Sequence, residues 1–383
     1  MVRGALAGLL AVLLGAALGA AERPLEIFFI DVEGGQSTLV VTPAGESLLI
    51  DAGYGPRTFR QPAGEPARDP NLDQARAASR DPDRIMAAVR EVGLTRIDYL
   101  IVTHFHNDHV GGVPELARRI PIGTFIDYGE PLGTDRMANN GFRAYGTVRG
   151  DRPHFIVKPG DRLPLKGVRV DVVSAGGALL TRPLKGGGET NTACSHAEDH
   201  PEDGTENYRS VGVMVEFGDF RFLDVGDLSG NTLTRIVCPR NMLGRASVYL
   251  VSHHGDYDSN VPVLYSGVRP RVAVMNNGAT KGGSPDAFRT LHAQPDLEDL
   301  WQLHAARDPK ARNAPEPFIA NVDDASDGHW LRLTAREDGS FRIVNGRTGA
   351  AKDYGRKRGP KTGTLPMPPG PPAEGSDTQS SAH

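Results

Sequence analysis

The chain has 383 residues, of which 39% are hydrophobic and 23% are charged, and its formal net charge at pH 7 is -4. This length and composition are typical of a globular enzyme with one large core, and they exclude a membrane protein built from several spanning helices. The negative net charge argues against an overall basic surface for nucleic acid, although it leaves room for a local basic groove.

The N-terminus has the layout of a secretory signal peptide. Arg3 precedes an apolar stretch from Ala5 to Leu18, and cleavage after Ala21 would leave Gly19 and Ala21 where a signal peptidase requires small residues. The apolar stretch is shorter than the roughly 20 residues that a membrane-spanning helix needs. We therefore expect a periplasmic or extracellular protein with no stable membrane partner, and a retained N-terminal anchor is the alternative.

Short apolar segments open the mature chain at 27–32, 37–42 and 47–51, and glycine or proline turns separate them. This pattern predicts an antiparallel meander. A polar stretch with Pro and Arg residues, from Pro56 to Asp81, then suggests a loop near the mouth of a site. Helical periodicity from Asp83 to Val92 predicts the first helix.

The most informative stretch is Thr-His-Phe-His-Asn-Asp-His-Val-Gly-Gly at 103–112, which follows an apolar strand at 97–102. Functional groups in α/β folds lie at the carboxyl ends of such strands. Imidazoles and carboxylates are ligands for zinc, and also for manganese or iron. Three histidines at these positions would occur by chance in roughly one such chain in a hundred. The stretch therefore predicts a metal site formed by His104, His106, Asp108 and His109.

The pattern His-x-His-x-Asp-His after an apolar strand resembles the signature of the metallo-β-lactamase superfamily. Segments 29–37, 49–53 and 253–255 are similar to the soluble hydrolase domain of ComEC-type competence proteins, and the similarity covers roughly residues 25–354. The resemblance implies an α/β fold, a four-layer αββα sandwich, with the metal site at the shared edge of its sheets. It also implies that Asp51 lies beside the site and orients the metal ligands.

After the motif we expect a helix at 113–120 and strands at 123–127 and 168–173. The segment from Gly129 to Asp151 contains Gly, Asn and Arg residues. It predicts an ordinary surface connection, with a loop that covers the substrate as the alternative.

An insertion from Gly176 to Glu206 carries Cys194, and the only other cysteine is Cys238. In an oxidising compartment the two would form a disulfide that pins the insertion, and two free thiols are equally compatible with the sequence. Many superfamily members take one more histidine ligand from about this place. His196 or His200 would provide it here, and solvated histidines are the favoured alternative.

The sequence Asn-Tyr-Arg-Ser at 207–210 resembles the start of the next strand in ComEC-like domains, which makes Asn207 and Ser210 candidate substrate contacts. A hairpin of strands at 210–217 and 220–225 then leads to Asp227. An aspartate at a strand end beside the histidines can present one oxygen to each of two ions, so Asp227 is the candidate bridging carboxylate.

The next strand, at 247–251, runs into Ser-His-His-Gly. Either His253 or His254 closes the second metal site, and the spacing does not distinguish them. The other histidine would bond a leaving group or support the ligand. Ser259 follows in a loop suited to substrate contact, and Lys281 in a glycine-rich segment suits an anionic substrate such as a phosphate.

The end of the chain predicts a strand at 272–275, a mainly helical segment at 285–303 and a hairpin of strands at 330–334 and 341–344. Beyond Tyr354 the chain is first basic and then rich in Pro, Gly and Ser, which is typical of a disordered tail. The predicted limits are 1–21 for the signal peptide, 22–354 for a hydrolase domain and 355–383 for the tail.

The predicted function is that of an exported metal-dependent hydrolase with two divalent ions, Zn²⁺ or alternatively Mn²⁺. The expected ligands are His104, His106 and Asp227 for the first ion, and Asp108, His109, Asp227 and either His253 or His254 for the second. Asp108 and His254 are the residues expected to act in catalysis. The resemblance implies a phosphodiester substrate, either a small molecule or a nucleic acid. The alternatives are a carboxylic ester or lactone, and a non-catalytic, metal-stabilised binding module.

Overall fold

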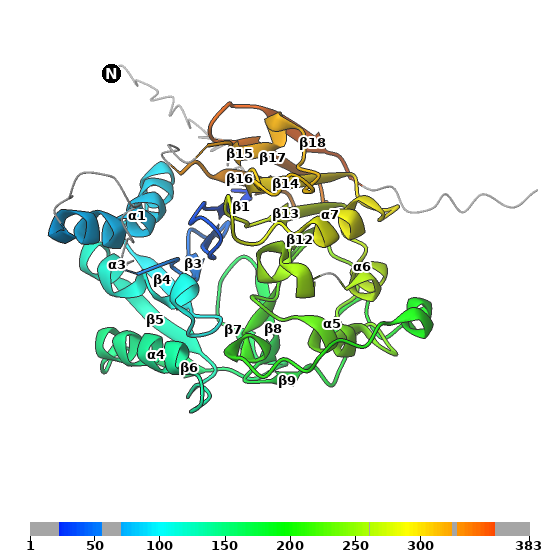
Figure 1. The fold of residues 1–383 in the computed structure, drawn as a ribbon, viewed down its shortest axis with the longest axis horizontal. Helices are drawn as coiled ribbons and strands as arrows, with labels where there is room; N and C mark the ends of the chain where they lie inside the picture. The colour runs from blue at the N-terminus through cyan, green and yellow to red at the C-terminus, as the bar shows by residue number, and fades with distance from the viewer. Residues whose placement is uncertain (1–22, 56–69, 260, 324–327, 357–383) are drawn as a thin grey trace, which may run out of the picture.

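Short apolar strands form two large sheets that lie face to face in the computed structural model, with helices on the outer face of each sheet (Figure 1). The structure describes residues 23–55, 70–259, 261–323 and 328–356. The predicted signal peptide and the predicted tail after Arg356 therefore lie outside the described residues. The observed mixed α/β architecture confirms the predicted four-layer αββα sandwich.

The first sheet has the strand order β18-β17-β16-β1-β2-β3-β4-β5-β6. Strands β1, β2 and β3 form the predicted antiparallel meander, and β3 to β6 are parallel. The strand bounds are β1 (Leu25–Phe29), β2 (Thr38–Val41), β3 (Ser47–Ile50), β4 (Ile97–Ile101), β5 (Ile122–Asp127), β6 (His154–Ile156), β16 (Leu331–Ala335), β17 (Phe341–Asn345) and β18 (Ala351–Tyr354).

The second sheet has the order β15-β14-β13-β12-β11-β10-β8-β7, and β9 pairs with β8. Its β10–β11 hairpin was predicted, and β11 to β15 are parallel. The strand bounds are β7 (Arg162–Leu163), β8 (Arg169–Ala175), β9 (Ala178–Leu179), β10 (Gly212–Phe217), β11 (Phe220–Asp224), β12 (Val248–Leu250), β13 (Val272–Met275), β14 (Asp299–His304) and β15 (Ile319–Asn321).

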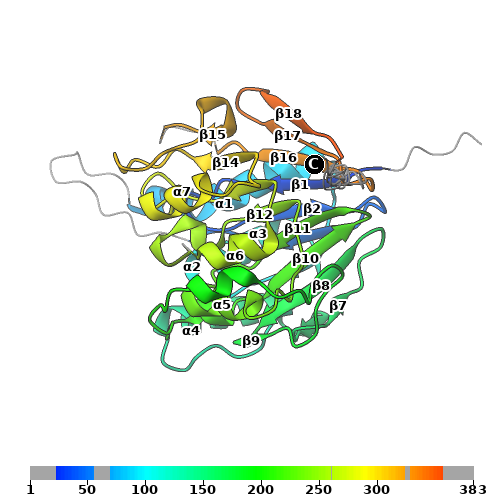
Figure 2. The ribbon, with the colours of Figure 1, turned by 90° about the vertical axis from the view of Figure 1, so that its right-hand side faces the viewer.

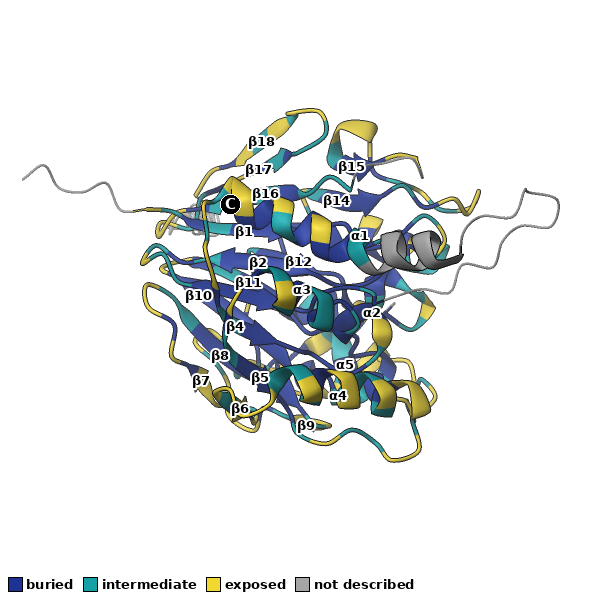
Figure 3. Cartoon of the chain, turned by 90° about the vertical axis from the view of Figure 1, so that its left-hand side faces the viewer, coloured by how far each residue is buried: buried dark blue, intermediate teal, exposed yellow. Residues whose placement is uncertain are grey.

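The main core lies between the sheets, where Phe29 of β1 meets Phe222 of β11 with ring centroids 5.5 Å apart. Helices α5, α6 and α7 cover the second sheet over a separate apolar cluster (Figure 2). Helices α1, α3 and α4 cover the first sheet and turn their buried faces toward it (Figure 3). The helix bounds are α1 (Pro70–Glu91), α2 (Asn107–Val110), α3 (Val113–Arg119), α4 (Arg136–Arg149), α5 (Gly230–Val237), α6 (Pro262–Val268) and α7 (Pro285–His292).

Helix α1 begins earlier than predicted. The sequence suggested a loop up to Asp81, but the helix already runs from Pro70, and residues 56–69 lie outside the described residues. Alanines have high helix propensity and favour a helix before Pro82. Tertiary contacts then hold the helix against the first sheet. Buried Arg84, for example, donates from Nη1 to the Asp31 carbonyl oxygen at 3.1 Å.

Helix α4 was missed, because the sequence predicted a surface connection between Gly129 and Asp151. Its glycines and asparagines have low helix propensity, and packing overrides that preference. Phe142 meets Phe105 with ring centroids 4.9 Å apart, and a Cβ at Gly141 would collide with the Phe105 carbonyl oxygen. The close approach of α4 to the metal motif therefore requires the glycine that made the helix hard to predict.

The predicted helical segment 285–303 is wrong after His292, where α7 ends. Strand β14 follows and lies between β13 and β15. Its Trp301 is fully buried and donates from Nε1 to the Tyr354 hydroxyl at 2.8 Å. The short apolar pattern of this segment fits both a helix and a strand. Its burial between β13 and β15 favours the strand.

Cys194 and Cys238 form a disulfide, which is one of the two alternatives that the sequence left open. It ties the 3₁₀ turn Thr192–His196 of the insertion to the end of α5. None of the helices within the described residues combines the length and apolar composition needed to cross a membrane.

Candidate metal centre

The candidate site lies where strands of both sheets end. Asp51 follows β3, and the histidine motif follows β4, which is parallel to β3. In the second sheet Asp227 follows β11, and His253 and His254 follow β12, again in parallel. Because the carboxyl ends of parallel strands lie at the same edge, four separate segments of the chain deliver polar side chains to one place.

Four of the predicted site residues form a compact group: Asp108, His109, Asp227 and His254. All four are buried, and one potential ligand atom from each lies within 4.8 Å of the others. Asp227 Oδ2 lies 3.0 Å from His109 Nε2 and 3.3 Å from His254 Nε2. Two imidazoles and two carboxylates are a donor set that suits a divalent cation.

Unsatisfied atoms in this group show that it fits a metal ion. Among the described residues, Asp227 Oδ1 and both ring nitrogens of His254 are buried without a hydrogen-bond partner. A buried polar atom without a partner costs roughly 1–3 kcal/mol. A cation would use these lone pairs, so the donor chemistry and the missing partners point to the same kind of ligand.

His104 and His106 lie beside the group and outside its four members. His104 is fully buried, and its Nε2 is 3.8 Å from Asp227 Oδ2 and 3.0 Å from His106 Nδ1. His106 Nε2 is 2.9 Å from Asp135 Oδ2. The structure therefore brings the three predicted ligands of the first ion next to one another and adds Asp135 as a partner of His106.

The structure distinguishes the two adjacent histidines. His254 belongs to the group of four, whereas His253 Nδ1 lies 2.6 Å from Asp258 Oδ1 and its Nε2 is 3.8 Å from Asp227 Oδ2. Both histidines have positive φ angles, 47° and 56°. Such backbone costs roughly 1–3 kcal/mol for a residue other than glycine, and it is concentrated at functional sites. This turn therefore presents His254 to the group at the expense of local strain.

Asp51 contacts the Nδ1 side of the His109 ring. Its Oδ1 accepts the Thr103 backbone N–H at 2.7 Å, and its Oδ2 accepts the Thr103 hydroxyl at 2.6 Å. The same Oδ2 lies 2.7 Å from His109 Nδ1. A proton on Nδ1 leaves Nε2 of His109 free to act as a ligand, so this contact selects the tautomer that metal binding needs.

The charges of the group are strongly coupled. Burial alone would raise the pKa values of Asp108 and Asp227, but the adjacent His109 holds both well below the ordinary aspartate range. Burial would lower the pKa of His109, and Asp227 and the other nearby carboxylates raise it well above its ordinary value. Burial lowers the pKa of His104, which is consistent with a neutral imidazole available as a ligand.

Two of the four predicted substrate contacts lie beside site residues, and the other two stabilise the local backbone. Lys281 Nζ forms an ion pair with Asp108 Oδ2, and Asn207 Nδ2 lies 3.4 Å from His253 Nε2. The Ser210 hydroxyl accepts the Asp227 backbone N–H at 3.2 Å, so it supports that loop. Ser259 is fully buried and donates to the Asp256 carbonyl oxygen at 2.6 Å, which stabilises its own turn.

The insertion histidines lie apart from the four-residue group. His196 is exposed, and His200 packs against Gly230 at the start of α5. Two aspartates that contact site histidines were not singled out as site residues: Asp135 and Asp258. Asp135 is the N-cap of α4, where it accepts the backbone N–H groups of Met137 and Ala138. Recognition of α4 from its cap would have placed this aspartate near the motif.

Comparison with known proteins agrees with this geometry. Residues 30–204, a little under half of the chain, match the model of the Metallo-beta-lactamase superfamily. A hydroxyacylglutathione hydrolase from Aliivibrio salmonicida is 43% identical over 51 residues, which cover 13% of this chain and 20% of that protein. The lactamase-like protein notP from Aspergillus sp. is 30% identical over 119 residues, 30% of each chain. The aligned regions thus span less than a third of either curated relative.

Two solved structures resemble parts of the fold. A metal-dependent hydrolase of the beta-lactamase superfamily is 15% identical, with a TM-score of 0.40 over 76% of this chain and 100% of the other. CmlA, a diiron beta-hydroxylase from Streptomyces venezuelae, is 14% identical, with a TM-score of 0.35 over 68% of this chain and 46% of the other. Similarity at this level carries no information about the reaction.

Proposed function

We propose that this metallo-beta-lactamase superfamily domain, within residues 22–354, is an exported hydrolase that cleaves phosphodiester bonds with the help of divalent metal ions. The observation that carries the proposal is the buried group of Asp108, His109, Asp227 and His254, in which several ligand atoms have no hydrogen-bond partner among the described residues. A purely structural polar cluster would satisfy these atoms with protein donors.

The arrangement is compatible with two ions, Zn²⁺ or alternatively Mn²⁺. His104, His106 and Asp227 would hold the first, and the group of four would hold the second, with Asp227 shared between them. When bound, such ions supply Lewis acidity, which acidifies water and stabilises the negative charge that develops during hydrolysis. Asp51 contributes by keeping His109 in the tautomer that leaves Nε2 free.

Polar groups around the ligands would position the substrate. Asn207 lies beside His253, which in turn lies beside Asp227, and Asp258 fixes the orientation of the His253 ring. Asn207 Oδ1 is buried without a hydrogen-bond partner within the described residues, which leaves an acceptor available. These groups suit hydrogen bonding to the oxygens of an ester substrate near the ligand cluster.

A phosphodiester is favoured because of Lys281. Its ammonium group pairs with the ligand carboxylate of Asp108, and its side chain is about one-third exposed. Cations at this position would neutralise an anionic substrate that binds over the ligand cluster. The resemblance of segments 29–37, 49–53 and 253–255 to the hydrolase domain of ComEC-type proteins implies the same class of substrate, either a small molecule or a nucleic acid.

The disulfide between Cys194 and Cys238 supports export, because such bonds persist in oxidising compartments. The signal-like segment at residues 1–21 supports the same conclusion. We therefore propose a periplasmic or extracellular location.

The test is hydrolysis of bis(p-nitrophenyl) phosphate by the mature protein with Zn²⁺ or Mn²⁺. We expect metal-dependent turnover, and we expect the Asp108→Ala/His109→Ala double variant to lose it. Absence of turnover in a wild-type protein that binds the metal would contradict phosphodiester hydrolysis.

The second candidate is hydrolysis of a carboxylic ester, thioester or lactone. The short match to a hydroxyacylglutathione hydrolase, 43% identical over 51 residues, favours it. A Lys281→Gln variant separates the two candidates. For a phosphodiesterase, it should raise the KM for the anionic phosphodiester and leave p-nitrophenyl acetate turnover little changed. Turnover of neutral esters alone would support the second candidate, and metal binding without any turnover would support a binding module.

A further inference from the structure

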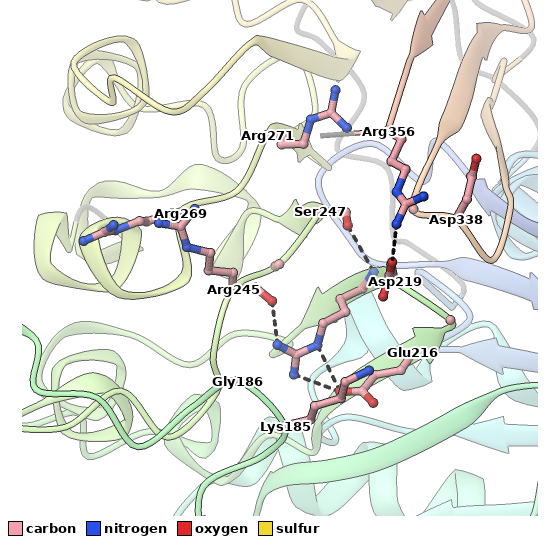
Figure 4. Close-up of a pocket in the computed structure, with 14 residues that line it drawn as sticks. Lys185, Gly186, Glu216, Asp219, Arg245, Ser247, Arg269, Arg271, Asp338 and Arg356 are labelled. Carbon is pink, nitrogen blue, oxygen red and sulfur yellow. Dashed lines mark hydrogen bonds and ion pairs between the residues drawn. The ribbon is translucent and has the colours of Figure 1, made fainter. Parts of the chain in front are cut away.

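A pocket of about 410 Å³ lies at the opposite end of the second sheet from the candidate metal centre. Figure 4 shows the side chains that line this pocket. Ser247 and Arg271 line it and directly precede β12 and β13, whereas His253 and His254 follow β12. The turn of the β10–β11 hairpin also lines it. The strands themselves therefore separate this pocket from the candidate metal site.

The pocket is locally basic in a chain whose net charge is -4. Three acidic side chains line it, and each of them has local partners. Glu216 pairs with Arg221 at 2.9 Å, Asp219 lies 3.9 Å from Arg356, and Asp338 accepts the backbone N–H of Ser340 at 2.9 Å. Six cationic side chains line the same pocket: Lys185, Arg221, Arg245, Arg269, Arg271 and Arg356.

Two of the arginines form a fixed part of the wall. Arg221 donates to Glu216 and to the carbonyl oxygens of Leu243 and Arg245, at 3.0, 2.8 and 2.6 Å. Arg271 is buried and pairs with Glu298 at 2.7 Å. These guanidinium groups are already committed to protein acceptors.

The remaining cations have few partners. Within the part of the chain that the structure describes, the Lys185 ammonium and the Arg245 guanidinium have no ion pair or side-chain hydrogen bond. Arg269 donates from Nε to the Ser266 carbonyl oxygen at 3.0 Å, and its Nη atoms have no partner among the described residues. All three side chains are exposed. Their charge is therefore available to a ligand.

The loops that carry these cations are held in place by close backbone contacts. A Cβ at Gly244 would collide with the carbonyl oxygen of Lys185 and with the Arg221 guanidinium, so the Lys185 loop packs directly on the loop before Arg245. A Cβ at Gly218 would collide with the Glu337 backbone, which joins turns from the two sheets. Such packing reduces the entropy lost when a ligand binds.

We propose that this pocket binds the phosphate group of a small anionic molecule at a site separate from the metal centre. Its volume is in the range of roughly 300–1,000 Å³ that small-molecule sites occupy. Arginine forks and a lysine ammonium are the side chains that recognise phosphate oxygens. Arg245, Arg269 and Lys185 provide the free donors, and the engaged arginines add positive charge behind them.

Calorimetric titration of the intact protein with inorganic pyrophosphate tests the proposal. Four proteins are compared: wild type, Lys185→Gln/Arg245→Gln, Arg182→Gln as an exposed control three residues before Lys185, and Asp227→Asn to disable the metal centre. We expect the last two to keep the wild-type affinity of this site. The double variant should bind pyrophosphate at least tenfold more weakly, with an unchanged circular dichroism spectrum and unchanged hydrolytic activity.

Loss of binding in Asp227→Asn with full binding in the double variant would assign pyrophosphate to the metal centre and overturn the proposal. Absence of binding by the wild type at millimolar pyrophosphate would overturn it as well. A single-stranded oligonucleotide is the second ligand. If it binds the wild type more tightly than pyrophosphate does, and the double variant loses that binding, the phosphate belongs to nucleic acid and the small-molecule assignment is wrong.

Discussion

The two ends of the second sheet differ in which charges have partners. At the carboxyl ends of β11 and β12, carboxylates and imidazoles are buried, and acceptor atoms of Asp227 and His254 have no partner among the described residues. At the opposite end, cations such as Arg245 are exposed and without protein partners in that same set. The buried carboxylates and imidazoles are therefore suited to bind a cation, and the exposed basic side chains are suited to bind an anion.

Burial makes the first requirement stronger than the second. A buried ligand atom has no water to replace a missing partner, whereas exposed cations remain solvated. Substitutions at the metal centre should therefore cause larger effects than substitutions in the basic pocket.

Asp227→Asn should reduce hydrolysis at least a thousandfold, because Asp227 contacts more of the site histidines than any other carboxylate of the group. Bound metal, measured by mass spectrometry, should fall with it. Asp224→Asn is the matched control. That residue lies on β11, and its Oδ2 accepts from Gln36 Nε2 at 2.8 Å. Equal losses in both variants would contradict a special role for Asp227.

Removal of the disulfide should lower the free energy of unfolding by about 3–4 kcal/mol, because the bond closes a loop with a sequence separation of 44. Cys194→Ser/Cys238→Ser is compared with wild type by denaturant unfolding. The insertion that carries Cys194 also carries Lys185, so pyrophosphate affinity should fall while hydrolysis of the folded protein persists. An equal loss of both functions would show that the two ends are not independent.

For a physical reason, the sequence indicated the residues that gather at the candidate metal centre better than the residues around them. Asp227 and His254 each follow an apolar strand, and that local pattern places them at a sheet edge without knowledge of the tertiary fold. Asp135 contacts His106 only because α4 forms, and α4 forms through packing on Phe105. Strand β14 likewise depends on its neighbours. The basic pocket collects residues from distant turns of both sheets, which no local pattern shows.

Asp31 provides a buried carboxylate whose Oδ2 lies 3.5 Å from Arg84 Nη1. It follows β1 near the metal end, and burial raises its pKa to about 6 although Arg84 opposes the shift. Well below pH 3.8 the proton is bound in both the folded and the unfolded state. As pH rises the unfolded state ionises first, so stability falls between about pH 3.8 and 6 and levels off above that range. We expect wild type to lose about 2–3 kcal/mol of stability relative to Asp31→Asn between pH 4 and 7. An exposed control, Asp151→Asn, should show no such trend in urea unfolding.

Asp51→Asn should weaken metal binding about 10- to 100-fold, the usual cost of changing a partner of a metal-bound histidine. Asp51 has a φ of 60°, a conformation that asparagine also tolerates, so the backbone is preserved. The amide would donate to His109 Nδ1 and leave the proton on Nε2, the atom that faces Asp227. Competition with a chelator measures the affinity. If metal affinity is unchanged while unfolding shows lost stability, Asp51 supports only the fold, and the tautomer of His109 is set elsewhere.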